Sequence, residues 1–338
     1  MATGLLLCTA WFYTILSGFY ILYCPVMYLM FFNHRLYRKI VDSLFALWEL
    51  YPVALFQCCC SSEIHHFGDY VNPDEKTLIV MNHRTRVDWN YVWIALYHAT
   101  QDPSDKCVCK QNDKDVQEVN ASNQIVDIGG KSKIKFVLKD EIKILPGIGW
   151  IMQLNFFLYV KRNWQEDEVN LSRFVDYYTT LDYGYRVVLF PEGTDLSEDN
   201  RRRSDKFAVT NHLLQYKYVL HPRTTGWAAL CTRLRQSGLT SIYDVTIAYD
   251  NPAQTEMDLM RGNIPTNIYF YFKRYPINQL PTEEAGLRSW LNDRWREKEN
   301  SLRKFHNEGY FIDPIANRPP PHRASSDNAP HIRNVLWI

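Results

Sequence analysis

The chain has 338 residues and a formal net charge of +1, and 46% of its residues are hydrophobic against 22% charged. This length is enough for one large domain with appendages, and the near-neutral charge gives no sign of nucleic-acid binding by bulk electrostatics. The aromatic content of 14% is high. Aromatic side chains favour membrane interfaces, where one end of the ring stays wet.

An apolar segment opens the chain. Residues 4–32 contain no Asp, Glu, Lys or Arg, and His34, Arg35, Arg38 and Lys39 follow them. The segment exceeds the roughly 20 residues needed to cross a bilayer. It lacks the basic start and the short apolar core of a cleaved signal peptide. We therefore expect an uncleaved hydrophobic membrane anchor at the N-terminus.

A second apolar stretch, residues 43–60, is interrupted by Glu49 and Pro52. We expect it to lie in the membrane interface or to turn back within the membrane, so that residues 1–60 form a membrane-associated helical region. The basic residues after the first segment favour the cytosol there. A second complete crossing would place the following residues in the lumen, and the topology is left open.

The eight cysteines give no disulfide framework. Cys107 and Cys109 are too close together for ordinary zinc ligation and have no partner pair nearby, so the sequence predicts no metal site. Three consecutive cysteines, residues 58–60, follow an apolar stretch. They fit either palmitoylation or reduced residues beside a membrane.

Helical and extended patterns alternate after residue 60, which predicts an α/β domain over residues 61–312. Residues 101–132 are polar and predict a flexible insertion, and residues 313–338, with three consecutive prolines, predict a linker-like tail. The strand 266–273 alternates as a half-buried edge strand would. The expected strands are 77–82, 134–139, 156–161, 186–190, 217–220, 242–249 and 266–273, and the expected helices are 88–99, 146–154, 165–181, 204–216, 225–236 and 283–305.

Polar residues follow two of the apolar strands. His83 and Asp88 come after the run 78–80, and a Gly-containing turn follows the run 187–189. A five-residue offset points side chains apart on a helix. His83 is therefore expected in the strand-to-helix turn, with Asp88 in the first helical turn. There Asp88 could hold one ring nitrogen and leave the other to take a proton.

Four blocks of sequence resemble the glycerolipid (lysophospholipid) acyltransferase family. Residues 82–89 and 190–195 resemble its first and third blocks, and residues 220–226 resemble the fourth. Residues 146–150 and 159–162 extend the match, which is closest to the lysocardiolipin branch and runs to about residue 312. The resemblance implies a mixed sheet flanked by helices, with acyl-CoA as co-substrate and no cofactor. It also implies a location in the endoplasmic reticulum membrane or its mitochondrial contact sites.

The resemblance also implies roles for individual residues. His83 would be the general base that deprotonates a lysophospholipid hydroxyl, with Asp88 orienting it. Arg162 is the first candidate for binding the lipid phosphate. The other substrate-binding candidates are Lys139, the turn Glu192-Gly193-Thr194, and Arg223 on the acyl-CoA side. Many relatives have Arg where this chain has Asp195, a substitution that removes one phosphate contact from that turn.

Several alternatives stay open at this stage. The acceptor could be lysocardiolipin, lysophosphatidylinositol or lysophosphatidic acid, because head-group choice depends on pocket shape. A membrane scaffold that kept the fold without turnover is a second class, against which the intact His83 and Asp88 pair counts. A metal-dependent hydrolase is a third class, although no ligand spacing supports it.

Overall fold

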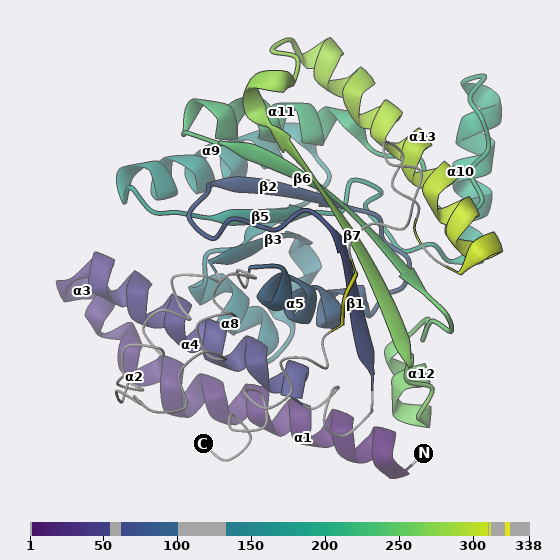
Figure 1. Ribbon diagram of the computed structural model, residues 1–338. Helices are drawn as coiled ribbons and strands as arrows, with labels where there is room; N and C mark the ends of the chain where they lie inside the picture. Colours follow the sequence, from purple (N-terminus) through teal and green to yellow (C-terminus); the bar gives the residue numbers. More distant parts are fainter. Residues whose placement is uncertain (1, 55–61, 101–132, 310, 312–321, 325–338) are drawn as a thin grey trace, which may run out of the picture.

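The computed structural model describes residues 2–54, 62–100, 133–309, 311 and 322–324. The expected insertion 101–132 lies outside them. An eight-stranded sheet in the order β4-β3-β5-β2-β6-β7-β1-β8 forms the centre, with helices on both faces (Figure 1). The strands are β1 Glu63–Gly68, β2 Thr77–Met81, β3 Ile134–Lys139, β4 Leu158–Val160, β5 Arg186–Leu189, β6 Ser241–Tyr249, β7 Asn267–Pro276 and β8 His322–Ala324.

The sheet is mixed, as expected. Strands β4, β3, β5, β2 and β6 run parallel to one another, β7 pairs antiparallel with β6, and β1 pairs parallel with β7. β8 closes the far side antiparallel to β1, so three residues of the expected linker-like tail form a strand. The carboxyl ends of the parallel strands share one edge of the sheet, where α/β enzymes place their sites.

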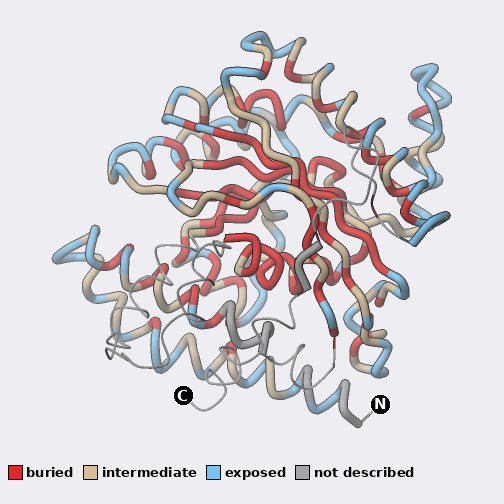
Figure 2. The backbone as a smooth tube through the Cα atoms, viewed as in Figure 1, coloured by how far each residue is buried: buried red, intermediate tan, exposed pale blue. Residues whose placement is uncertain are grey.

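Two hydrophobic layers enclose the sheet, and the sheet is the most deeply buried part of the molecule (Figure 2). The N-terminal helices, α5 and α8 cover one face, while α9, α11 and α13 cover the other (Figure 1). The helices are α1 Ala2–Gly18, η1 Phe19–Tyr23, α2 Cys24–Met27, α3 Leu29–Phe32, α4 His34–Ala54, α5 Asp88–Ala99, η3 Asp140–Ile144, α8 Ile148–Leu154, α9 Trp164–Thr180, α10 Glu198–Thr210, α11 Thr224–Gln236, α12 Glu256–Arg261, η4 Ile277–Gln279 and α13 Glu284–Glu308.

The expected edge position of β7 is wrong. β7 lies between β6 and β1, with Ile268, Phe270 and Phe272 buried on one face. Its other face is covered by α13, where the Tyr269 ring lies 4.9 Å from Phe305. The alternation therefore reflects tyrosines under a helix rather than a solvent-exposed edge. The neighbouring strand β1 was missed because its polar sequence, with two histidines, lacks an apolar pattern.

Two further expectations around residue 210 need correction. The helix expected at 204–216 begins earlier and forms α10, and it ends before His212, which has a left-handed φ of 53°. The strand expected at 217–220 is not formed. Instead, the buried carboxylate of Glu299 accepts the backbone N–H groups of Lys217 and Tyr218 at 3.1 and 2.8 Å. Hydrogen bonds to α13 thus replace those of a sheet.

The N-terminal region packs against the domain. Within the described residues, one helical segment, Thr9–Phe32, is long and apolar enough to cross a membrane. Ile15 and Tyr23 within it are nevertheless buried against the domain, and the ring centroids of Trp11 and Trp89 lie 5.1 Å apart. The second apolar stretch, as far as it is described, belongs to α4, which buries a face including Phe45 in the same hydrophobic layer.

A buried charge cluster fixes α4 to the sheet. The Asp42 carboxylate accepts a hydrogen bond from the ammonium of Lys135 in β3 at 2.8 Å. The same oxygen lies 3.1 Å from a guanidinium nitrogen of Arg38, and all three side chains are almost fully buried. Burial would raise the pKa of Asp42, but Arg38 and Lys135 outweigh it and hold that pKa below its usual range. The cluster orients α4 because breaking a buried pair leaves a costly unpaired charge.

Candidate active site

The expected pair forms at the carboxyl end of β2. His83 lies in the turn between β2 and α5, and its Nδ1 lies 3.0 Å from Oδ2 of Asp88, the first residue of α5. The imidazole is 19% exposed while the Asp88 side chain is fully buried. Among the described residues no group hydrogen-bonds to Nε2 of His83, so this nitrogen is available to a substrate. The Phe190 ring, 4.7 Å from the imidazole, limits its movement.

Four other donor groups converge on the Asp88 carboxylate. The backbone N–H of Arg84 donates at 2.6 Å, Thr85 donates through its N–H and its hydroxyl, and the Tyr249 hydroxyl donates at 2.6 Å. A buried carboxylate requires such donors, because burial alone disfavours its charge. They also fix the rotamer of Asp88, and therefore the ring of His83.

Tyr249 is a site residue that sequence analysis missed. It ends β6 and lies 161 residues from Asp88 in the chain. Burial and the neighbouring Asp88 carboxylate raise its pKa well above the usual value, so the phenol keeps its proton and remains a donor. One available signal was a tyrosine directly after the apolar pair Ile247-Ala248 at the end of the expected strand 242–249, since a buried hydroxyl needs a partner.

The Glu192 carboxyl points into the protein. Its side chain is buried, and Trp295 of α13 donates its indole N–H to Oε1 at 3.2 Å. Burial raises the pKa of Glu192 well above its usual value, against the opposing effect of the nearby backbone N–H groups of Leu220 and His83. Glu192 therefore joins the third block to the first and fourth blocks. Its expected contact with substrate stays a prediction that this burial does not favour.

The turn after Glu192 uses its polar groups internally. Gly193 has a φ of +72°, and its N–H donates to the Phe190 carbonyl at 3.0 Å. The Thr194 hydroxyl accepts the Asn200 amide at 2.9 Å and donates to Asp195 at 3.3 Å. These groups would have to exchange partners to bind phosphate.

The predicted cationic residues come together around this turn. Arg162, held at a left-handed φ of 64°, donates to the Gly193 carbonyl, and the Arg223 side chain lies directly over Gly193. Partial burial and the charge of Arg162 lower the pKa of both Arg223 and Lys139. Three cations from separate parts of the chain thus form what we call the cationic cluster: Arg162, Arg223 and Lys139. Such a group suits a phosphate.

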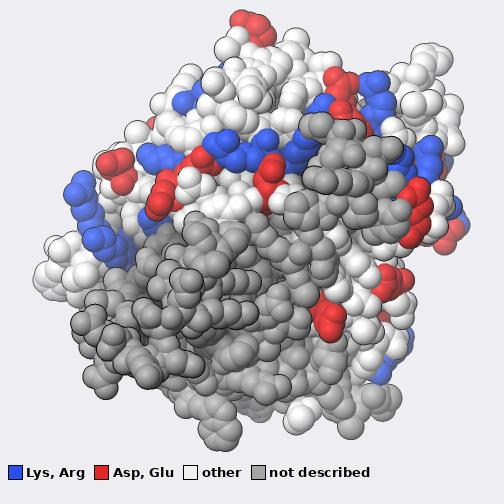
Figure 3. Space-filling view, viewed as in Figure 1, with Lys and Arg blue, Asp and Glu red and all other residues white. Residues whose placement is uncertain are grey.

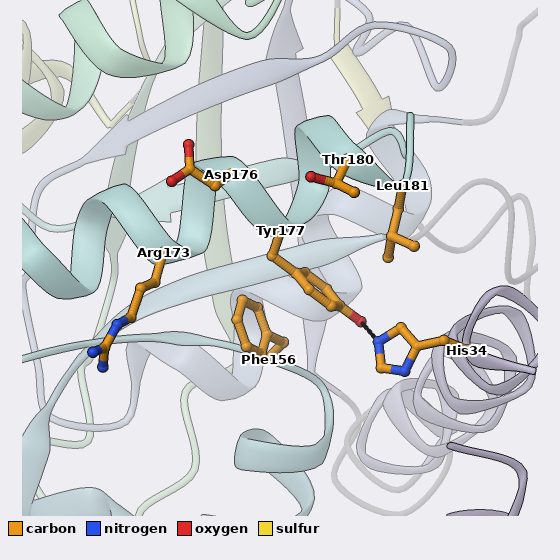
Figure 4. Close-up of a pocket in the computed structure, with 7 residues that line it drawn as sticks. All are labelled: His34, Phe156, Arg173, Asp176, Tyr177, Thr180 and Leu181. Atoms are coloured by element: carbon orange, nitrogen blue, oxygen red, sulfur yellow. Dashed lines mark hydrogen bonds between the residues drawn. The ribbon is translucent and has the colours of Figure 1, made fainter. Parts of the chain in front are cut away.

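None of the site residues named above lines the pocket found in the structure. A shallow pocket lined by His34, Phe156, Arg173 and Tyr177 lies between α4 and α9, where His34 and Tyr177 share a 2.9 Å hydrogen bond (Figure 4). On the face in Figure 3, basic and acidic side chains are interspersed. Within the described ranges no group of three His, Cys, Asp or Glu residues could hold a metal ion.

Comparison with known proteins decides the family. A model described as Acyltransferase matches residues 121–250, and one described as Acyltransferase C-terminus matches residues 258–332. Lysocardiolipin acyltransferase 1 of Mus musculus is 37% identical over 284 residues, which cover 83% of this chain and 68% of that protein. This chain belongs to the lysophospholipid acyltransferase family. Membership confirms the expected class of enzyme.

A second relative of this acyltransferase is named for a different substrate. Lysophosphatidylinositol acyltransferase 10 of Caenorhabditis elegans is 35% identical over 279 residues, 82% of this chain and 64% of that protein. The crystal structure of the 1-acyl-sn-glycerophosphate acyltransferase PlsC from Thermotoga maritima has 15% identity and a TM-score of 0.48, covering 88% and 96% of the two chains. His83 and Asp88 precede the matched range of the Acyltransferase model, so their assignment rests on the motif and the geometry.

Replacing Tyr249→Phe should lower kcat about tenfold and change KM less than about twofold, because Asp88 loses one donor while the binding groups are untouched. Steady-state kinetics would measure both constants. Tyr243→Phe is the matched control, since this buried tyrosine lies on the same strand but hydrogen-bonds at the other end, to Tyr70. Equal losses of kcat in the two variants would contradict the positioning role of Tyr249.

Replacing Glu192→Gln should keep the acceptor for Trp295 and make stability less sensitive to pH. Because the folded pKa of Glu192 is raised, the contribution of this carboxyl to wild-type stability is full below the ordinary carboxyl pKa. That contribution is lost as pH rises toward the folded pKa, by about 1.4 kcal/mol per pKa unit. The stability gained by the variant should therefore grow between pH 5 and pH 8 in denaturant unfolding. A gain independent of pH, or one matched by exposed Glu141→Gln, would refute this.

Proposed function

We propose that this chain is a membrane-bound, acyl-CoA-dependent acyltransferase that acylates a free hydroxyl of a lysophospholipid. The acceptor is of the lysocardiolipin or lysophosphatidylinositol type, and the product is a phospholipid with a remodelled acyl chain. The observation that carries the proposal is the His83–Asp88 pair with a free Nε2, beside the cationic cluster. The names of two relatives support the choice of acceptor.

The dyad accounts for the chemistry without a protein nucleophile. His83 Nε2 takes the proton of the acceptor hydroxyl while the hydroxyl oxygen attacks the thioester carbonyl of acyl-CoA. The new C–O bond forms, the C–S bond breaks, and the proton on His83 passes to the departing CoA thiolate. Asp88 stabilises the transient imidazolium through Nδ1. Such general-base assistance contributes about 10²–10⁴ in rate.

The cationic cluster would fix the acceptor. The side chains of Arg162 and Arg223 contact the third-block turn at Gly193. This turn begins at Phe190, whose ring packs against the His83 ring. A phosphate bound there would hold the glycerol hydroxyls near Nε2, and this positioning is itself a large part of catalysis. The apolar N-terminal segment supports attachment to a membrane, for which the family resemblance implies the endoplasmic reticulum.

Microsomes containing the chain should transfer a labelled oleoyl group from oleoyl-CoA to a lysophospholipid, and His83→Ala should reduce transfer by about 10²–10⁴. His65→Ala, on the remote strand β1, is the matched control and should retain activity within about twofold. Product analysis across lysocardiolipin, lysophosphatidylinositol and lysophosphatidic acid would name the acceptor.

Each outcome of this assay separates one function from another. A preference for lysophosphatidic acid would favour the second candidate, the synthesis of phosphatidic acid, which is suggested by a 32% identical Arabidopsis thaliana protein named a probable 1-acyl-sn-glycerol-3-phosphate acyltransferase. No transfer to any acceptor would favour the scaffold. Transfer that survives His83→Ala would show that another group is the base.

A further inference from the structure

Two aliphatic side chains of the catalytic domain are exposed to solvent at the end of η3, the short helix that follows β3. Ile144 is 78% exposed and Leu145 is 47% exposed, whereas Ile142 in the same turn packs against the core. Single exposed aliphatic residues are common on protein surfaces. The significance of this pair depends on how its backbone is held and on what borders it.

The backbone of the turn is fixed against α8. Gly149 leaves no room for a Cβ because the carbonyl oxygens of Ile142 and Lys143 lie directly against it. Gln153 donates its amide to the Lys143 carbonyl at 3.1 Å, and the Lys143 ammonium pairs with Asp140. A turn held in this way presents Ile144 and Leu145 outward in a fixed direction, rather than leaving them free to fold back onto the core.

One side of the turn borders the apolar N-terminal segment. Gly147, with a φ of +74°, approaches α1 so closely that a Cβ would lie 2.7 Å from Ile15 and 3.1 Å from Leu16. Both residues belong to the segment that is apolar enough to cross a membrane. The outer surface of that helix exposes further large apolar side chains, among them Phe12 and Tyr13. The exposed pair therefore extends an apolar surface that α1 begins.

The short helix η3 that leads into the turn begins beside the cationic cluster. Lys139, the last residue of β3, directly precedes η3, and the charge of Arg162 acts on its ammonium. Aliphatic side chains next to cations are typical of proteins that sit in a membrane interface, where acyl chains take up the first and lipid phosphates bind the second. The two borders thus point to the same partner.

We propose that the turn carrying Ile144 and Leu145 inserts into the phospholipid bilayer beside α1, as a membrane contact of the catalytic domain itself. The contact rests on the proposed membrane attachment and deepens it, because it holds the cationic cluster at the level of the lipid phosphates. An acceptor could then bind through its phosphate while its acyl chain stays in the bilayer.

Photo-crosslinking in phospholipid vesicles tests the contact directly. Ile144→p-benzoylphenylalanine should attach radiolabelled lipid acyl chains on illumination, at several times the yield of Leu214→p-benzoylphenylalanine. Leu214 is a matched control because it is 70% exposed and follows α10, which lies across the molecule from α1 (Figure 1). Equal yields at the two positions, or no lipid attached at position 144, would overturn the proposal.

Kinetics separate this contact from the proposed function. The double variant Ile144→Ser, Leu145→Ser should raise the apparent KM for a vesicle-embedded acceptor about tenfold, because two aliphatic side chains leave the bilayer. Its turnover of a water-soluble short-chain acceptor should stay within about twofold of wild type. Leu213→Ser, Leu214→Ser is the control and should change neither value.

The two hypotheses fail in different ways. An unchanged KM in vesicles, or an equal loss with both acceptors, would overturn the membrane contact and leave the acyltransferase function intact. A wild-type chain that transfers nothing to either acceptor would refute the proposed function, and the crosslinking yields would still decide the contact.

Discussion

The site depends on how the buried carboxylate of Asp88 is compensated. A carboxylate with no exposure must replace water with protein donors. Here the donors come from His83, the β2–α5 turn and the end of β6. That requirement fixes the conformation of the turn, the start of α5 and the pairing of β2 with β6 at once. The orientation of the imidazole follows from it.

A second buried carboxyl organises the surroundings of this dyad. Glu192 contacts Trp295 of α13, and it lies near the backbone of His83 and of Leu220, so the first, third and fourth blocks converge on one group. Arg162 and Arg223 hold the outer side of the same turn. The turn from Phe190 to Gly193 therefore positions both the base and the cationic cluster. It can hold the hydroxyl and the phosphate of one lipid at a fixed separation.

The sequence was sufficient where the determinants are local. The apolar run of β2 and the helical pattern that starts at Asp88 were enough to predict the bounds of α5. The five-residue offset between His83 and Asp88 was enough to predict their contact. Long-range packing explains the failures. Tyr249 reaches Asp88 across 161 residues, and Trp295 reaches Glu192 across 103, so neither partner could be inferred from spacing. β7 was misplaced because its cover comes from a helix that follows it in the chain.

The most direct measurement is the single-turnover rate of acyl transfer for Asp88→Asn with acyl-CoA and acceptor both saturating. The amide can still accept from the backbone N–H of Arg84 with its oxygen, but it carries no negative charge to stabilise the imidazolium that forms on His83. We expect a rate about 10²–10⁴-fold lower than that of the wild type, with acyl-CoA binding retained. A rate within about threefold of wild type would contradict the His83–Asp88 mechanism.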